Sequence, residues 1–171
     1  MSDFFGRVTG DQDPIRKLVS HIPGFNGYIE RTNRRAADKL LRDTVARRFE
    51  ELYKRLSTIQ ADLISQGNID FVDDLEKAAL LMRTFTDKLR NATYGYSGLF
   101  DAVKINQEEL SKIYSFDAAF FDLADQIKNA LDTVEASAVE GLPAAIRNLV
   151  TLSRQAINTY EQRYEIFNGA K

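Results

Sequence analysis

The sequence predicts an all-α fold, an antiparallel up-down bundle of four long helices with coiled-coil-like packing. Apolar residues recur every three or four positions through four long segments, which keeps them on one face of a helix. Glycine- and proline-containing turns separate the segments, and none of them alternates as a strand would. We expect a single domain, in which residues 1–27 are a tail with a short helix and a Pro/Gly turn and residues 28–171 are the four-helix bundle.

The N-terminal part predicts a short helix over Pro14–Ser20, because Asp13 can cap it and proline suits the first helical position. The residues 22–27 then force a turn, since they contain one proline and two glycines. The first long helix is expected over residues 28–66, ending at Gly67-Asn68. Because it is longer than the others, we expect its arginine-rich start to overhang the bundle.

Three further helices follow in the sequence. Asp70 is the predicted N-cap of the second, which runs to about Ala92. Asn106 and Glu109 have the spacing of a capping box and open the third, which runs to about Glu135. The fourth begins at Gly141-Leu142-Pro143 and ends at Gly169. The side chains expected to be largely buried are Phe49, Leu52, Leu56, Leu75, Met82, Phe85, Phe120, Ile127, Leu131, Leu149, Ile157 and Tyr160.

The composition removes several classes of function. The chain has no cysteine, which excludes disulfides and thiol catalysis, and no apolar run long enough to span a membrane. One histidine, His21, lies outside the long helices, and no glycine-rich nucleotide motif or nucleophile elbow occurs. We therefore expect no catalytic, cofactor-binding or metal-binding residues, no enzyme activity, and a cytoplasmic location. The acids Asp117, Asp122, Asp125 and Asp132 are expected to be spread around the third helix as solvated charges.

The basic start of the first long helix is the first candidate interaction surface. Its basic residues are Arg31, Arg34, Arg35, Lys39 and Arg42, and four of them step by four, four and three positions along one helical face. Such a stripe could contact phosphates of nucleic acid or of an anionic membrane. The alternative is a solvated helix stabilised by acid–base pairs four residues apart, such as Asp38–Arg42.

Aromatic residues in two glycine-containing connections form the second candidate surface: Phe25, Tyr28, Tyr94, Tyr96 and Phe100. If these connections meet at one end of the bundle, the aromatic side chains would lie beside the arginines. Aromatic residues and arginine are enriched at protein interfaces, although the same rings could instead plug the end of the bundle.

The function that these features favour is a non-catalytic helical bundle acting by protein–protein interaction, as an adaptor, regulator or assembly component. Its partners would be other proteins, or further copies of the chain in a homo-oligomer. The alternative is electrostatic binding of nucleic acid or an acidic membrane through the basic helix start. A sequence pI near 5.5 counts against a dedicated nucleic-acid binder.

Overall fold

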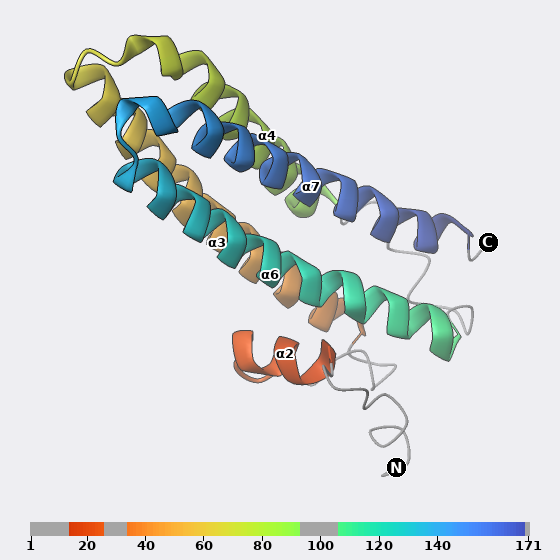
Figure 1. Ribbon diagram of the computed structural model, residues 1–171. Helices are drawn as coiled ribbons and strands as arrows, with labels where there is room; N and C mark the ends of the chain where they lie inside the picture. Colours follow the sequence, from red (N-terminus) through yellow and green to blue (C-terminus); the bar gives the residue numbers. More distant parts are fainter. Residues whose placement is uncertain (1–13, 26–33, 93–105, 170–171) are drawn as a thin grey trace.

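The computed structural model describes residues 14–25, 34–92 and 106–169, and within these ranges the regular secondary structure is entirely helical (Figure 1). The predicted all-α bundle with a short N-terminal helix is therefore confirmed. The elements are the α-helices α2 (Pro14–His21), α3 (Arg34–Ser65), α4 (Val72–Asn91), α6 (Gln107–Ala136) and α7 (Leu142–Gly169), and the 3-10 turns η2 (Ile69–Phe71) and η3 (Val139–Gly141).

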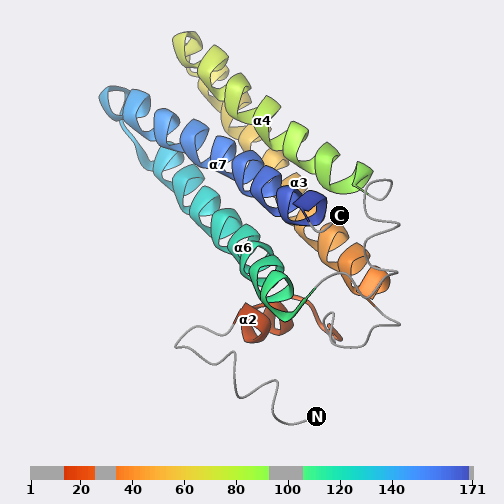
Figure 2. The same cartoon turned by 90° about the vertical axis from the view of Figure 1, so that its right-hand side faces the viewer.

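The four long helices form two hairpins, α3 with α4 and α6 with α7 (Figures 1 and 2). Within the first hairpin the helices are antiparallel, since Glu50 pairs with Arg90 near one end and Gln60 reaches the Val72 carbonyl near the other. In the second hairpin, the short turn at η3 reverses the chain in the same way.

Between the hairpins, α3 lies parallel to α6. Arg48 pairs with Asp125 and Arg55 with Asp132, so both helices advance by seven residues in the same direction between the two pairs. It follows that α4 runs parallel to α7, against which it packs. Antiparallel pairing is thus found within each hairpin, and parallel pairing where the hairpins meet.

The short helix α2 packs across α6. The His21 ring stacks on the Phe121 ring with centroids 4.5 Å apart and planes 2° apart, and Lys17 forms an ion pair with Asp122. Ile15, Leu18 and other apolar residues of this segment join the same hydrophobic core as the long helices. The α2 segment therefore belongs to the bundle's core and is not a separate unit.

The predicted stop signal at Gly67 is confirmed. Gly67 has a φ of +81°, in the left-handed region that favours glycine. The Gly67 N–H donates to the Ile64 carbonyl at 3.0 Å and the Asn68 N–H to the Leu63 carbonyl at 2.9 Å. This pair of bonds satisfies two of the last α3 carbonyls and ends the helix.

The starts of the helices agree with the sequence prediction in three cases and differ in one. The capping box is present: the Glu109 N–H donates to Asn106 Oδ1 and the Asn106 N–H to Glu109 Oε2, each at 2.9 Å. Helices α2 and α7 begin at Pro14 and Leu142 as predicted, and the predicted cap of α2, Asp13, lies outside the described residues. The prediction that Asp70 caps α4 is wrong, because Asp70 lies inside η2 and Phe71 takes the N-cap position.

The core follows the predicted stripes. Eleven of the twelve side chains expected to be buried are so, and Ile157 is half-buried because Ala156 and Tyr160 occupy the inward positions of that turn. Phe85 lies between two other rings, with its centroid 4.4 Å from that of Phe49 and 5.3 Å from that of Phe120. These aromatic contacts join α3, α4 and α6 at the middle of the bundle.

The expected overhang of the arginine-rich start is wrong from Ala37 onward. Ala37, Asp38 and Leu41 are all buried, so this part of α3 packs inside the bundle. The part of the predicted helix before Arg34 lies outside the described residues.

Candidate functional site

The structure describes only part of the two predicted interaction surfaces. On the basic stripe, Arg35 and Lys39 are exposed and Arg34 is half-buried, whereas Arg42 is 4% exposed. Phe25 is also buried, as part of the hydrophobic core. Arg42 and Phe25 are therefore not part of an exposed surface, and including them was wrong. The other predicted surface residues lie outside the described ranges: Arg31, Tyr28, Tyr94, Tyr96 and Phe100.

The reason for the burial of Arg42 is a layer of charges inside the bundle. Arg42 Nε donates to Asp38 Oδ2 at 2.8 Å, so the predicted Asp38–Arg42 pair forms, but in the interior. Arg42 Nη1 donates to the Leu89 carbonyl of α4 at 2.9 Å. From α7, Arg163 donates through Nη2 to Asp38 Oδ1 at 2.8 Å and through Nε to Asp117 Oδ1 at 2.5 Å.

This buried charge layer, Asp38, Arg42, Asp117 and Arg163, joins all four long helices. The four side chains are between 0% and 4% exposed, and their formal charges cancel. Among the described residues, every buried side-chain nitrogen or oxygen has a hydrogen-bond partner. Such a fully hydrogen-bonded layer is suited to fixing how the helices align, because a shifted helix would leave a buried charge without its partner.

Sequence reasoning missed Asp117 and Arg163 as members of this layer. The expectation that Asp117 is solvated is wrong, because its carboxylate is fully buried against Arg163. The available signal was the position of each residue in its stripe: Asp117 falls between Ile113 and Phe120, at the inward spacing of four and three.

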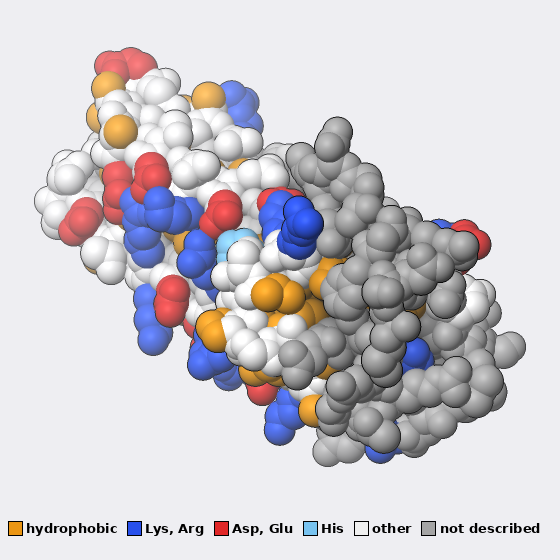
Figure 3. Space-filling model, turned by 90° about the horizontal axis from the view of Figure 1, so that it is seen from below, with side chains coloured by type: hydrophobic (Ala, Val, Ile, Leu, Met, Phe, Trp, Pro, Cys, Tyr) orange, Lys and Arg blue, Asp and Glu red, His pale blue; other side chains and the backbone are white. Residues whose placement is uncertain are grey.

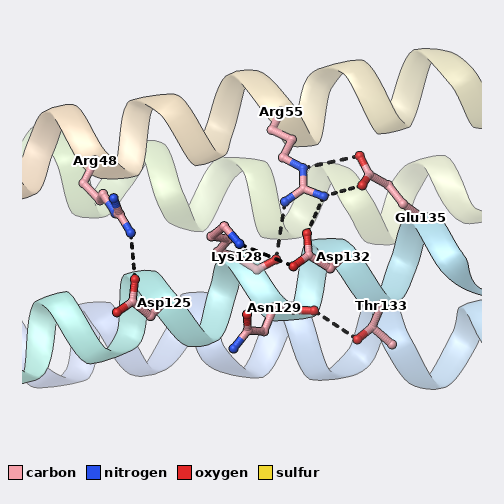
Figure 4. A network of polar contacts seen from close by, with 8 residues as sticks. All are labelled: Arg48, Arg55, Asp125, Lys128, Asn129, Asp132, Thr133 and Glu135. Carbon is pink, nitrogen blue, oxygen red and sulfur yellow. Dashed lines mark hydrogen bonds and ion pairs between the residues drawn. The ribbon is translucent and has the colours of Figure 1, made fainter.

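A second group of charges follows the outside of the α3–α6 seam (Figure 4). Arg48 Nη2 of α3 donates to Asp125 Oδ1 at 2.7 Å, and Arg55 Nη2 to Asp132 Oδ1 at 2.6 Å and to Glu135. Figure 3, which looks onto the α2 side of the bundle, shows basic and acidic side chains intermingled over this face. Each pair is half-exposed and therefore worth little individually.

The seam pairs shift the pKa values of their members. The hydrogen bond to Glu135, followed by that to Asp132, raises the pKa of the Arg55 guanidinium above its ordinary value. The hydrogen bond from Arg55 lowers the pKa of the Asp132 carboxyl. The expectation that the acids of this helix spread around it is wrong for Asp122, Asp125 and Asp132, since all three face bases of α2 or α3 along one side. They form no metal-binding group among the described residues.

The end of the bundle that carries η2 and η3 shows a different chemistry. Ile64, Ile69 and Val139 are exposed there, by 49%, 64% and 50%. They are half of the large apolar residues found exposed in the described ranges, which also include Val19, Leu40 and Leu80. We call these three residues, with the neighbouring acids Asp62, Asp70, Glu135 and Glu140, the turn-end surface.

A recess of about 440 Å³ opens within the turn-end surface. It lies between the last turns of α3 and the link from α6 to α7, with Leu63, Val134 and Leu142 among its lining residues. These three side chains are buried and form an apolar floor, whereas Asp62 and Glu135 supply carboxylates at the side. The lining of the recess is therefore partly apolar and partly acidic.

At the opposite end, a groove of about 540 Å³ runs between the last turns of α4 and α7. Tyr160 and Tyr164 line it as stacked rings 6.4 Å apart, and Lys88 Nζ lies 5.9 Å from the centroid of the Tyr160 ring while also pairing with Glu161. Because both tyrosines make further contacts, this groove is partly committed to interactions within the chain.

No helix in the described part of the chain combines the length and apolar character needed to cross a membrane. Comparison with known proteins gives no family model, no curated protein and no solved structure that matches this chain.

Proposed function

We propose that this protein is a non-catalytic helical bundle that acts in the cytoplasm by binding other proteins, as an adaptor, regulator or assembly component. The observation that carries the proposal is the turn-end surface, where Ile64, Ile69 and Val139 are exposed at the same end of the bundle and Val139 also lines a recess. Exposed apolar groups that gather in one place, rimmed by polar residues, are typical of protein interaction sites. A cytoplasmic location suits a chain without cysteine, which needs no oxidising compartment.

The buried charge layer supports the non-catalytic part of this proposal. Its carboxylates and guanidinium groups would be the strongest candidates for acid–base chemistry, yet they are at most 4% exposed and are paired with one another. A catalytic group must come within hydrogen-bond reach of the substrate, directly or through one water. These side chains therefore serve the alignment of the helices.

The experiment compares a turn-end triple variant, Ile64→Gln, Ile69→Gln and Val139→Gln, with the control Leu80→Gln, whose residue is 60% exposed on α4. Both variants should stay folded, since exposed substitutions change the free energy of unfolding by about 0.5 kcal/mol or less each. In proximity labelling in the native host, we expect the triple variant to lose the strongest labelled proteins and the control to keep them. Identical labelling by the folded triple variant would contradict the proposal.

The alternative, binding to an anionic polymer or membrane, is favoured by the exposure of Arg35 and Lys39 on α3. If it holds, an Arg35→Gln/Lys39→Gln variant should bind duplex DNA or anionic vesicles at least about tenfold more weakly, and added salt should weaken the wild type in the same way. Wild-type protein that binds neither probe at about 50 mM salt would exclude this alternative.

A further inference from the structure

The turn-end surface is acidic as well as apolar. The two segments that form it, residues 62–74 and 135–142, contain six carboxylates and no lysine or arginine. Two of these are paired: Glu135 with Arg55 from the seam, and Asp74 with Lys77 of α4. The others include Asp62, Asp70 and Glu140, which are exposed. Any group that covers Ile69 and Val139 must therefore approach past several negative charges.

The helix ends at this surface carry partial charges of both signs. Helices α3 and α6 both finish here, at Ser65 and Ala136, and the last carbonyls of a helix carry a partial negative charge. Helices α4 and α7 begin here with partial positive N-termini, and only α4 has acids, Asp73 and Asp74, in its first turn. The exposed carboxylates therefore set the preference of this surface for cationic groups over anionic groups.

We propose that the turn-end surface binds a basic amphipathic helix of a partner protein. Apolar residues spaced three and four apart on such a helix would cover Ile64, Ile69 and Val139 and reach toward the recess. Lysine or arginine side chains at its flanks would lay their apolar stems over the surface and place their charges beside Asp62, Asp70 and Glu140. This inference rests on the proposed function and adds the chemistry of the partner.

The test uses two alanine-based helical peptides of about 16 residues, a length that supports helix formation. Both carry leucines spaced three and four apart; lysines flank the leucines in one peptide and glutamates in the other. In a fluorescence anisotropy titration of the full chain at about 50 mM salt, we expect the lysine peptide to bind at least about tenfold more tightly than the glutamate peptide. The charge-reversed variant Asp62→Lys/Asp70→Lys/Glu140→Lys should invert this preference.

The apolar contribution is tested with the same peptides. The turn-end triple variant should bind the lysine peptide at least about tenfold more weakly, whereas Leu80→Gln should bind it as the wild type does. Unchanged binding by the triple variant would mean that the preference for the lysine peptide comes only from attraction between opposite charges, and this would overturn the proposal. Equal binding of both peptides, or a concentration-dependent dimer of the wild type that the triple variant abolishes, would overturn it as well.

The two proposals can fail separately. If the triple variant loses its partners in the native host but the peptides show no preference for positive charge, a protein-binding turn end stands and the basic partner does not. If the triple variant keeps every partner in the native host, the proposed function itself fails.

Discussion

Replacing Arg163 with methionine removes the positive charge that joins Asp117 and Asp38 inside the bundle. Arg163 is 1% exposed, and the two carboxylates that it contacts are 0% and 2% exposed. Methionine fills much of the same volume without a charge, so the cost arises mainly from carboxylates left in the interior without this guanidinium. Breaking a buried ion pair from one side costs about 3–5 kcal/mol, and we expect an Arg163→Met variant to lose that much free energy of unfolding.

The matched control is Arg48→Met on the α3–α6 seam. Arg48 pairs with Asp125 at 2.7 Å, but the two side chains are 40% and 50% exposed, so water replaces the lost contact. We expect a loss of at most about 1 kcal/mol. Urea unfolding followed by circular dichroism at the helix band measures both variants, with the slope of free energy against urea checked for equality.

A third variant distinguishes two effects on the free energy of unfolding: the loss caused by breaking the layer from one side, and the contribution of the intact layer. Replacing all four charged residues together with leucine or methionine removes every charge of the layer, so the free energy of unfolding should fall far less than in Arg163→Met, or rise by about 1–4 kcal/mol. An Arg163→Met loss below about 1 kcal/mol, equal to that of Arg48→Met, would refute the conclusion that these charges are buried and depend on one another for pairing.

Three further predictions concern the seam, a helix end and the core. Because Arg55 lowers the pKa of Asp132, this pair stabilises the fold above the unfolded-state pKa of the carboxyl, and the stabilisation is lost as the pH falls through the lowered pKa. Arg55→Gln should therefore raise the Asp132 pKa in an NMR titration, and an unchanged pKa would contradict the pairing. Gly67→Ala should destabilise the fold by about 1 kcal/mol or more, because φ at Gly67 is +81°. Gly141→Ala should have a small effect or none, because a Cβ added there would meet only ordinary contacts at 3.5 Å. Equal thermal shifts of the two variants would contradict this prediction. Phe120→Ala should cost about 3–5 kcal/mol in chemical unfolding, since the ring is fully buried against Phe85, and a loss under about 1 kcal/mol would place Phe120 outside the core.

Periodicity and capping chemistry were enough to predict the helices. The apolar stripe of α3 predicts its buried face, and the Asn106–Glu109 spacing predicts the start of α6, because both depend on residues close in sequence. The sequence predicts that α4 starts at Asp70, because an aspartate is a good cap, but the 3-10 turn η2 continues through that residue. Local propensity does not separate a 3-10 turn from the first turn of the α-helix that follows it.

The buried charge layer shows that a charged residue in a helical stripe is not always exposed to solvent. Asp38 and Arg42 precede Val45 and Phe49 at the same spacing of four and three, so the inward stripe begins with charged residues and not with Leu41. A charged residue at an inward position predicts a buried partner on another helix. Which helix supplies it could not be predicted, because the sequence does not fix how the two hairpins face each other.

The turn-end surface could not be predicted from periodicity. Ile69 and Val139 lie in the 3-10 turns η2 and η3, where the helical repeat is interrupted and a sequence does not separate inward from outward positions. Their exposure follows from how the two hairpins end side by side, which requires the tertiary structure.

The central claim, that the turn end is where this protein contacts its partner, is tested most directly by site-specific photocrosslinking in the native host. A photoreactive phenylalanine derivative is placed at Ile69 in one version of the chain and at Leu80 in another, two positions that are 64% and 60% exposed. We predict a discrete crosslinked product from position 69 that is absent from position 80. The same products from both positions, or none from position 69, would contradict the claim.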